Sequence, residues 1–265
     1  MKSSSLMRAL RGAAVAAGLL LLAACASAPH GVEPSGPDAK TARIRLELAE
    51  GYYQRGQAEV ALTEVDKALE MAPDYVAAYN VKGLIQMSLG QPDQAEASFR
   101  KALGLAPDNG DTLHNYGWFL CGRARYPEAF TMFERALKVP GYRSVERTEL
   151  ALGVCQLRAG DTAGAEATLR RGFALDPVNP ALATNLALAL YRQRKPKDAL
   201  FYIRRVNTGN TANAQSLWLG VLIARGAADA MDQAQWSNEL TQRFPNSQEA
   251  IAVQQGHFDD NGLLP

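Results

Sequence analysis

The sequence has few of the side chains that carry most enzyme and metal chemistry. Its 265 residues include three histidines and three cysteines. They form no His-x-x-x-His or Cys-x-x-Cys pair, no glycine-rich phosphate loop and no Gly-x-Ser-x-Gly elbow. Asp108, Asn109 and Asp111 resemble part of a calcium loop but lack its closing glutamate. We therefore predict a protein that is not an enzyme, has no metal site or cofactor, and acts on no small-molecule substrate.

An excess of either charge is also absent. Lys and Arg number 28, and Asp and Glu number 27. The first 24 residues contain three of the basic residues and no acidic one, which leaves 25 basic against 27 acidic residues and a net charge of −2 in the remainder. This balance does not supply the phosphate-neutralising surface that nucleic acid requires, so we expect no nucleic-acid partner. No apolar run reaches the roughly 18 residues of a membrane-spanning helix.

The first residues have the pattern of a secretory signal peptide. Residues 1–11 are basic, and residues 13–22 form an apolar stretch that is too short to span a membrane. This stretch ends in the sequence LAAC at residues 22–25, which resembles a bacterial lipobox. We assign residues 1–24 to a lipoprotein signal peptide that is removed from the mature protein.

The lipobox resemblance implies that the thiol of Cys25 receives a covalent lipid and that Cys25 becomes the first residue. Alanine rather than aspartate at position 26 implies the outer membrane in lipoproteins of this kind. The alternative is that residues 26–28 (ASA) are an ordinary cleavage site and that Cys25 is discarded. Residues 25–41 are rich in Pro, Gly and Ser, so we expect an acylated cysteine followed by a flexible tether. The expected location is the outer membrane, lipid-anchored and facing the periplasm.

A repeated pattern begins after this tether. Residues 68–74 (ALEMAPD) recur 34 residues later as residues 102–108 (ALGLAPD). The pattern resembles the tetratricopeptide repeat (TPR), in which antiparallel helix pairs stack into a superhelix. We expect an all-α superhelical array of about six TPR repeats, at residues 42–75, 76–109, 110–145, 146–179, 180–213 and 214–246. Residues 247–265 are expected to form a C-terminal cap and tail, with Ser247 capping a short helix and residues 259–265 frayed.

Small residues at fixed places explain how the two helices of each repeat can pack. They occur inside the first helix at Ala49, Gly83, Gly117 and Gly153, and near the start of the second helix at Ala61, Ala95, Ala129 and Ala165. Such small side chains allow two antiparallel helices to approach closely. We expect the larger side chains of Phe99, Phe133 and Leu169 to fill the space between helix pairs.

Two cysteines fall in the first helices of consecutive repeats. These helices are neighbours in a stacked array, which brings Cys121 and Cys155 close together. A disulfide is the natural state of two neighbouring thiols in an oxidising periplasm, and we predict one here. The alternative is a pair of buried free thiols, which are common in protein cores.

The concave surface of the array can be predicted from the helical period, because the inner face of each first helix recurs every three or four residues. Its apolar, aromatic and amide side chains suit an amphipathic peptide or strand. The candidate partner-binding groove comprises Tyr53, Asn80, Leu84, Met87, His114, Asn115, Trp118, Leu150 and Tyr191. The alternative is that Leu84, Leu150 and Trp118 belong to the core between repeats. The basic residues at positions 192, 194, 195 and 197 are typical of a solvated turn, and less often of a contact for an acidic partner.

One segment resembles a particular family. Residues 115–121 (NYGWFLC), followed by residues 125–129 (RYPEA), are closely similar to the signature region of the type IV pilus biogenesis and stability lipoproteins, the PilW/PilF family. The resemblance covers nearly the whole mature chain. It departs from the family pattern at His114, where another amide is common.

This resemblance implies an outer-membrane pilotin that scaffolds the assembly and stability of secretin multimers for the type IV pilus. The implied partners are secretin subunits, which we expect on the concave face of repeats one to three. A second implied contact is the inner leaflet of the outer membrane, reached through the acyl chains (palmitate) on Cys25. The alternative is a periplasmic TPR adaptor lipoprotein that organises enzymes of peptidoglycan synthesis or hydrolysis. Co-purification separates the two.

Overall fold

The computed structural model describes residues 33–34, 36–209, 211–259 and 262–264. The predicted signal peptide, Cys25 and most of the predicted tether therefore lie outside the described residues. Within them the chain is all-helical, with thirteen α-helices and no strand. None of these helices has both the length and the apolar character needed to cross a membrane.

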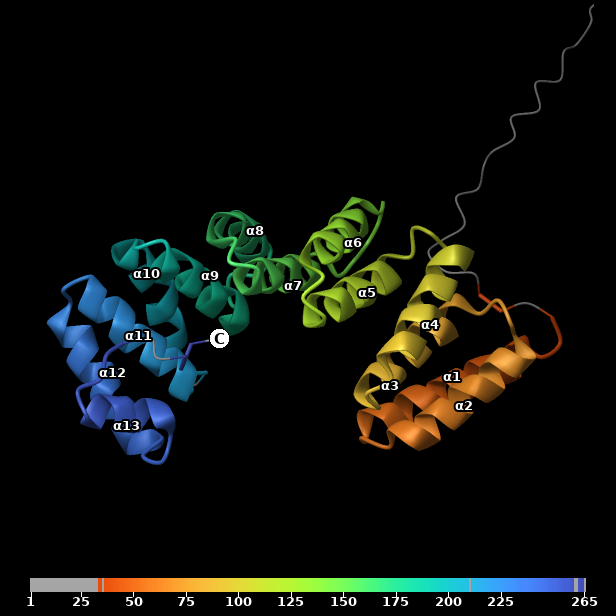
Figure 1. The fold of residues 1–265 in the computed structure, drawn as a ribbon, viewed down its shortest axis with the longest axis horizontal. Helices are drawn as coiled ribbons and strands as arrows, with labels where there is room; N and C mark the ends of the chain where they lie inside the picture. The colour runs from red at the N-terminus through yellow and green to blue at the C-terminus, as the bar shows by residue number, and fades with distance from the viewer. Residues whose placement is uncertain (1–32, 35, 210, 260–261, 265) are drawn as a thin grey trace, which may run out of the picture.

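Six helix pairs and one terminal helix make up the array (Figure 1). The pairs are α1 (Ala39–Gln54) with α2 (Ala58–Met71), α3 (Val76–Ser88) with α4 (Pro92–Leu105), α5 (Gly110–Gly122) with α6 (Tyr126–Lys138), α7 (Val145–Arg158) with α8 (Thr162–Leu175), α9 (Pro180–Arg192) with α10 (Pro196–Asn207), and α11 (Ala214–Gly226) with α12 (Ala230–Arg243). The last helix is α13 (Gln248–Gln254). The all-α repeat architecture predicted from the sequence is confirmed.

The first helix begins earlier than predicted. We expected the tether to extend to residue 41, but α1 starts at Ala39. Ala39 and Ala42 are both buried and lie on one face of the helix, three residues apart. The burial of this face extends the helix into a segment whose composition alone suggested a coil.

Glycine and a large side chain meet inside most pairs. A Cβ atom added to Gly83 would lie 2.7 Å from the ring of Phe99, and one added to Gly117 would lie 3.0 Å from the ring of Phe133. The sixth repeat has the same arrangement, because a Cβ on Gly220 would lie 2.7 Å from the ring of Trp236. Real Cβ contacts are rarely this close, so the small residue is what lets the two helices approach.

The turn between the helices of each pair passes through one residue in the left-handed region. Three of these residues are glycines, and three are not: Ala124, Arg194 and Ala228, with φ between 57° and 60°. A residue with a Cβ adopts this conformation at a cost of about 1–2 kcal/mol. The turn geometry is thus imposed by the packing of the helices on either side of it.

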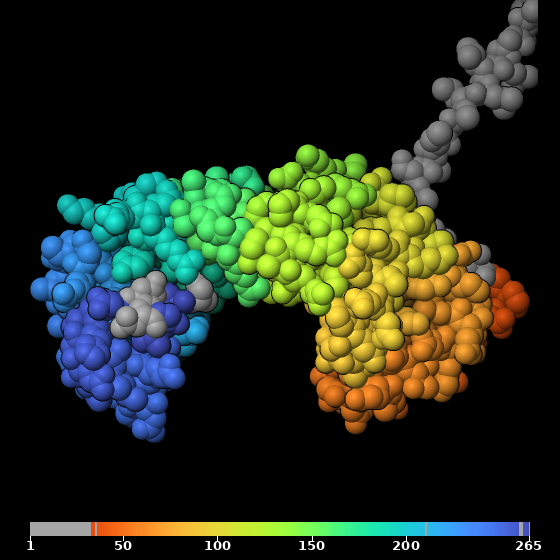
Figure 2. Space-filling view, viewed as in Figure 1, coloured from red at the N-terminus to blue at the C-terminus, as the bar shows by residue number. Residues whose placement is uncertain are grey.

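The stacked pairs form an arch. In Figure 1, α6, α8 and α10 lie along its outer side and α5, α7 and α9 along its inner side. Figure 2 shows that the N-terminal and C-terminal ends turn toward the same side, with a wide hollow between them. The first helix of each central repeat therefore faces the concave surface, as in the sequence prediction.

The C-terminal segment differs from the prediction. The predicted cap is confirmed, since the Ser247 side chain accepts a hydrogen bond from the Ala250 amide at the start of α13. The prediction that residues 259–265 are frayed is wrong for the leucines. Leu264 is only 8% exposed, and Leu263 packs against the same core cluster. Burial of these two apolar side chains holds the described part of the tail on the last repeats.

Candidate protein-binding groove

A groove of about 460 Å³ lies on the inner side of the arch. It is lined by His114, Asn115 and Trp118 from α5, by Arg147, Leu150, Ala151 and Val154 from α7, and by Ala181 and Asn185 from α9. Asn115, Ala151 and Asn185 occupy the same place in their repeats, two residues before the small residue of the first helix. The repeat therefore explains why the groove forms: the first helices are stacked, so equivalent residues of consecutive repeats lie side by side.

A polar network holds one arginine at the edge of this groove. Nε of Arg147 donates to Nε2 of His114 at 3.0 Å, and Nη2 donates to the Asn115 side-chain oxygen at 3.1 Å. Asn115 in turn donates to the side-chain oxygen of Asn80 at 3.0 Å. These bonds connect α3, α5 and α7, so three consecutive repeats fix the position of the guanidinium group.

His114 is a buried member of this network. Its other ring nitrogen, Nδ1, lies 2.8 Å from the Thr148 hydroxyl, which also contacts the Tyr142 hydroxyl at 2.8 Å. Since Arg147 can only donate, Nε2 must accept and Nδ1 must carry the proton. Burial, and secondly the positive charge of Arg147, lower the pKa of His114 to about 3. The imidazole is therefore neutral near pH 7, and the positive charge is that of Arg147.

Trp118 is the exposed large apolar residue of the groove. It is 36% exposed, and the guanidinium of Arg158 lies 5.0 Å from the centroid of its ring. Leu150 and Val154 on α7 add apolar surface beside it. The groove thus combines an apolar floor with cationic groups at its edge.

The structure brings together only part of the predicted groove. His114, Asn115, Trp118 and Leu150 line it, and Asn80 supports it through Asn115. His114 and Asn115 are only 5% and 8% exposed, because their polar atoms are occupied by other side chains. His114 thus lines the groove as predicted, but both of its ring nitrogens are bonded within the chain, and it positions Arg147.

The remaining predicted residues lie elsewhere. The Tyr53 hydroxyl donates to the Leu84 carbonyl oxygen, and both side chains are half-buried. Leu84 and Met87 pack against the core cluster of the second to fourth repeats, and Tyr191 packs against that of the last repeats. For Leu84 the core assignment is therefore the better one. This groove lies on repeats three to five, whereas we expected secretin subunits on the concave face of repeats one to three.

Five groove residues were missed from the sequence. Repeat alignment could have found Ala151 and Asn185, which are equivalent to Asn115, and Val154, which is equivalent to Trp118. Arg147 and Ala181 lie in the first turn of their helices, before the residues from which we identified the inner face. No sequence signal distinguishes Arg147 from the other arginines.

A disulfide lies in the same two helices as most of the groove. Cys121 of α5 is bonded to Cys155 of α7, with Cα atoms 5.8 Å apart. Both residues are buried, in one cluster with the groove residue Ala151. The pairing is the one that the neighbouring repeats predicted. It fixes the spacing of α5 and α7, which carry seven of the nine groove residues.

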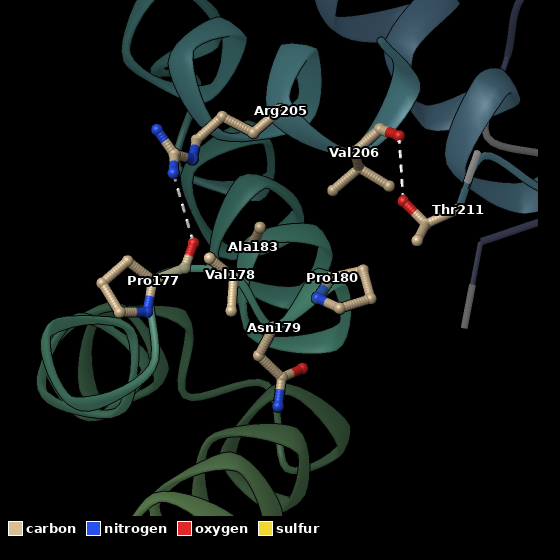
Figure 3. A pocket seen from close by; sticks show the side chains of 8 residues that line it. All are labelled: Pro177, Val178, Asn179, Pro180, Ala183, Arg205, Val206 and Thr211. Carbon is tan, nitrogen blue, oxygen red and sulfur yellow. Dashed lines mark hydrogen bonds between the residues drawn. The ribbon is translucent and has the colours of Figure 1, made fainter. Parts of the chain in front are cut away.

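Another hollow, of about 310 Å³, lies where the loop after α8 meets the end of α10 (Figure 3). Val178 is 84% exposed beside it. Its polar groups are used within the chain: Arg205 donates to the Pro177 carbonyl and Thr211 to the Val206 carbonyl. We assign this hollow to the junction between repeats. In the basic turn at the other end of α9 and α10, Lys195 pairs with Glu166 of the preceding repeat.

The fold and groove define the class of protein. TPR family models match residues 46–110 and 150–214, and another matches residues 110–139. Among the described residues, no group of histidine, cysteine and acidic side chains could hold a metal ion. A stacked helical scaffold with an open concave groove is the architecture of a TPR protein.

The comparisons then give the family. The chain is 31% identical over 212 residues to the type IV pilus assembly protein PilF of Pseudomonas aeruginosa, covering 80% of this chain and 83% of PilF. It is similar to the crystal structure of PilW, a widely conserved type IV pilus biogenesis factor, with 31% identity, a TM-score of 0.75, and coverage of 81% of this chain and 99% of PilW. The solved structure of P. aeruginosa PilF gives 29% identity and a TM-score of 0.74, over 82% and 98% of the two chains. The chain belongs to this family of type IV pilus TPR proteins.

Proposed function

We propose that this protein is an outer-membrane lipoprotein, a pilotin, that scaffolds secretin assembly and stability for the type IV pilus. The observation that carries the proposal is an open concave groove in a chain that belongs to the PilF family. The protein acts as an adaptor rather than an enzyme. Its partners are secretin subunits, bound through the first helices of the central repeats.

Attachment to the membrane is the second part of the proposal. Acyl chains on Cys25 hold the array at the inner leaflet of the outer membrane, and each buried CH₂ contributes about 0.8 kcal/mol. The tether lets the array capture a subunit near the membrane. Confinement of both partners there raises their effective concentration and favours assembly without further contacts.

Two variants test this proposal in the cell. Cys25→Ser removes the site of lipidation, and Ala26→Asp keeps the lipid but changes the residue that directs outer-membrane sorting. We expect a soluble periplasmic protein from the first and an inner-membrane protein from the second. Both are expected to reduce heat-resistant secretin multimers, measured by immunoblot at equal protein levels. Unchanged multimers in both strains would overturn the proposal, and capture of peptidoglycan enzymes in place of secretin would favour the cell-wall adaptor.

A further inference from the structure

Arg147 differs in its partners from the ion-paired arginines of this array. Arg171 pairs with Glu149, Arg125 with Glu96 and Glu128, and Arg204 with Asp229 and Asp232. In the described part of the chain, Arg147 forms no ion pair with a carboxylate. Its partners are the neutral side chains of His114 and Asn115. The charge is held in place by hydrogen bonds and is not neutralised.

Of the described residues that line the groove around Arg147, none is acidic. Arg158, whose guanidinium lies over Trp118, adds a second positive charge at the opposite end of α7 from Arg147. In Arg147 the bonds to His114 and Asn115 use Nε and one hydrogen of Nη2, which leaves Nη1 and the second Nη2 hydrogen for a ligand. A carboxylate is the group that complements such a pre-positioned guanidinium.

The sixth repeat shows how this concave face receives a peptide. Trp218 lies at the position equivalent to groove residues Asn115, Ala151 and Asn185. Phe258 of the chain's own tail stacks on Trp218 with ring centroids 6.4 Å apart, and the guanidinium of Arg225 lies 4.9 Å from the Phe258 ring. An aromatic residue and an arginine on a first helix thus hold an apolar side chain of a non-helical segment. At the open groove, Trp118 of α5 and Arg158 of α7 also place an aromatic ring and an arginine together, here with the guanidinium over the Trp118 ring itself.

We propose that the groove on α5, α7 and α9 binds an extended peptide segment that carries a carboxylate next to an apolar side chain. The carboxylate binds Arg147, and the apolar side chain packs on Trp118 and Leu150. The inference rests on the proposed function, since it names the chemistry of the protein segment that the groove captures. A groove of about 460 Å³ has room for a few side chains, so the recognised motif is short.

Selection from random peptides tests the ligand chemistry of the groove directly. The full mature chain, with Ser in place of Cys25, is immobilised and used to select from a phage-displayed library of random peptides. The same selection is made with Arg147→Gln and with the matched control Arg143→Gln, an exposed arginine outside the groove. Wild type and the control are expected to enrich Asp or Glu beside Leu, Phe or Trp. Arg147→Gln is expected to lose the acidic preference.

A selected peptide and its Glu→Gln or Asp→Asn form then supply the affinity measurement, by fluorescence anisotropy. Arg147→Gln in the protein, or loss of the carboxylate from the peptide, should alone weaken binding about 10- to 100-fold, as for a charged hydrogen bond. The two changes together should weaken binding little further. Arg147→Lys, which keeps the charge but loses the planar fork, should fall between. Equal acidic enrichment with Arg147→Gln, no acidic enrichment with wild type, or fully additive losses would each overturn the inference.

Capture of secretin subunits by the same proteins separates this inference from the proposed function. If wild type and Arg147→Gln capture secretin equally, the inference fails and the proposed function stands. If wild type selects acidic peptides through Arg147 but captures no secretin, the proposed function fails and the ligand chemistry stands. Circular dichroism of each variant identifies any loss of binding that comes from unfolding.

Discussion

The buried histidine makes stability depend on pH in a predictable way. In the folded protein, burial and the charge of Arg147 lower the pKa of His114 from 6.5 to about 3. In the unfolded chain the imidazole returns to its ordinary pKa, near 6.5. Between these values the unfolded state binds a proton that the folded state does not. Stability from this group is therefore full above pH 6.5 and is lost as the pH falls toward 3.

The expected magnitude follows from the two pKa values. At pH 5 the unfolded state gains about 2 kcal/mol relative to the folded state from protonation of this one side chain. This free-energy difference changes little as long as the pKa of His114 in the folded protein stays well below 5, because the folded imidazole is then neutral at both pH 8 and pH 5. Two carboxylates respond at lower pH, because their pKa values are also lowered. The hydrogen bond from Lys67 lowers the pKa of Glu64, and at Glu96 burial raises the pKa but the hydrogen bonds from Arg125 and Tyr116 together outweigh it.

The assay is urea unfolding followed by circular dichroism at pH 8 and pH 5, with wild type and His114→Gln. All other titrating groups are common to both proteins. The difference between their losses of unfolding free energy on acidification therefore reports His114 alone. We expect wild type to lose about 2 kcal/mol more than the variant on acidification. The variant itself is less stable at pH 8, since it disturbs the bonds to Arg147 and Thr148. Parallel losses in the two proteins, or a His114 ring signal in NMR that titrates near pH 6.5, would refute the reasoning.

Four further substitutions or treatments test the packing of the array. Reduction of the Cys121–Cys155 disulfide, which closes a 34-residue separation, should lower the free energy of unfolding by about 4 kcal/mol in urea titrations with and without dithiothreitol. Ala228→Gly relieves a φ of 60° and should stabilise the protein by about 0.5–1 kcal/mol; a loss of stability would contradict the strain. Gly83→Ala should destabilise by about 1–3 kcal/mol, whereas Gly104→Ala, which meets no atom within 4 Å, should stabilise by about 0.5–1 kcal/mol. Equal melting shifts for the two alanine variants would contradict the close packing.

The repeat architecture could be predicted from the sequence because each unit carries its own packing rule. Gly83 with Phe99 and Gly117 with Phe133 have the same spacing of 16 residues, and each pair meets in the structure. The cysteine pairing follows from the same logic, since it needs only that neighbouring first helices lie side by side. Local periodicity was sufficient for both.

The groove could be predicted only in part, because it depends on contacts between residues about 33 positions apart. His114 looked like a recognition group on α5, yet Arg147 on α7 takes its acceptor nitrogen. The apolar end of the tail, assigned as frayed, packs on the last repeats, and Phe258 covers Trp218. Periodicity finds the inner face of each helix, but it does not say which part of that face the chain itself already occupies.

The disulfide and the hydrogen-bond network around Arg147 join the same two helices that form most of the open groove. The Cys121–Cys155 bond and the network through His114 and Arg147 both join α5 to α7, one near the ends of these helices and the other near their beginnings. Two links at opposite ends restrict both the separation and the relative rotation of the helices. The groove between these two links is therefore already rigid before a peptide binds. Little conformational entropy is lost on binding, which favours affinity for a short segment. This is why we place recognition at repeats three to five.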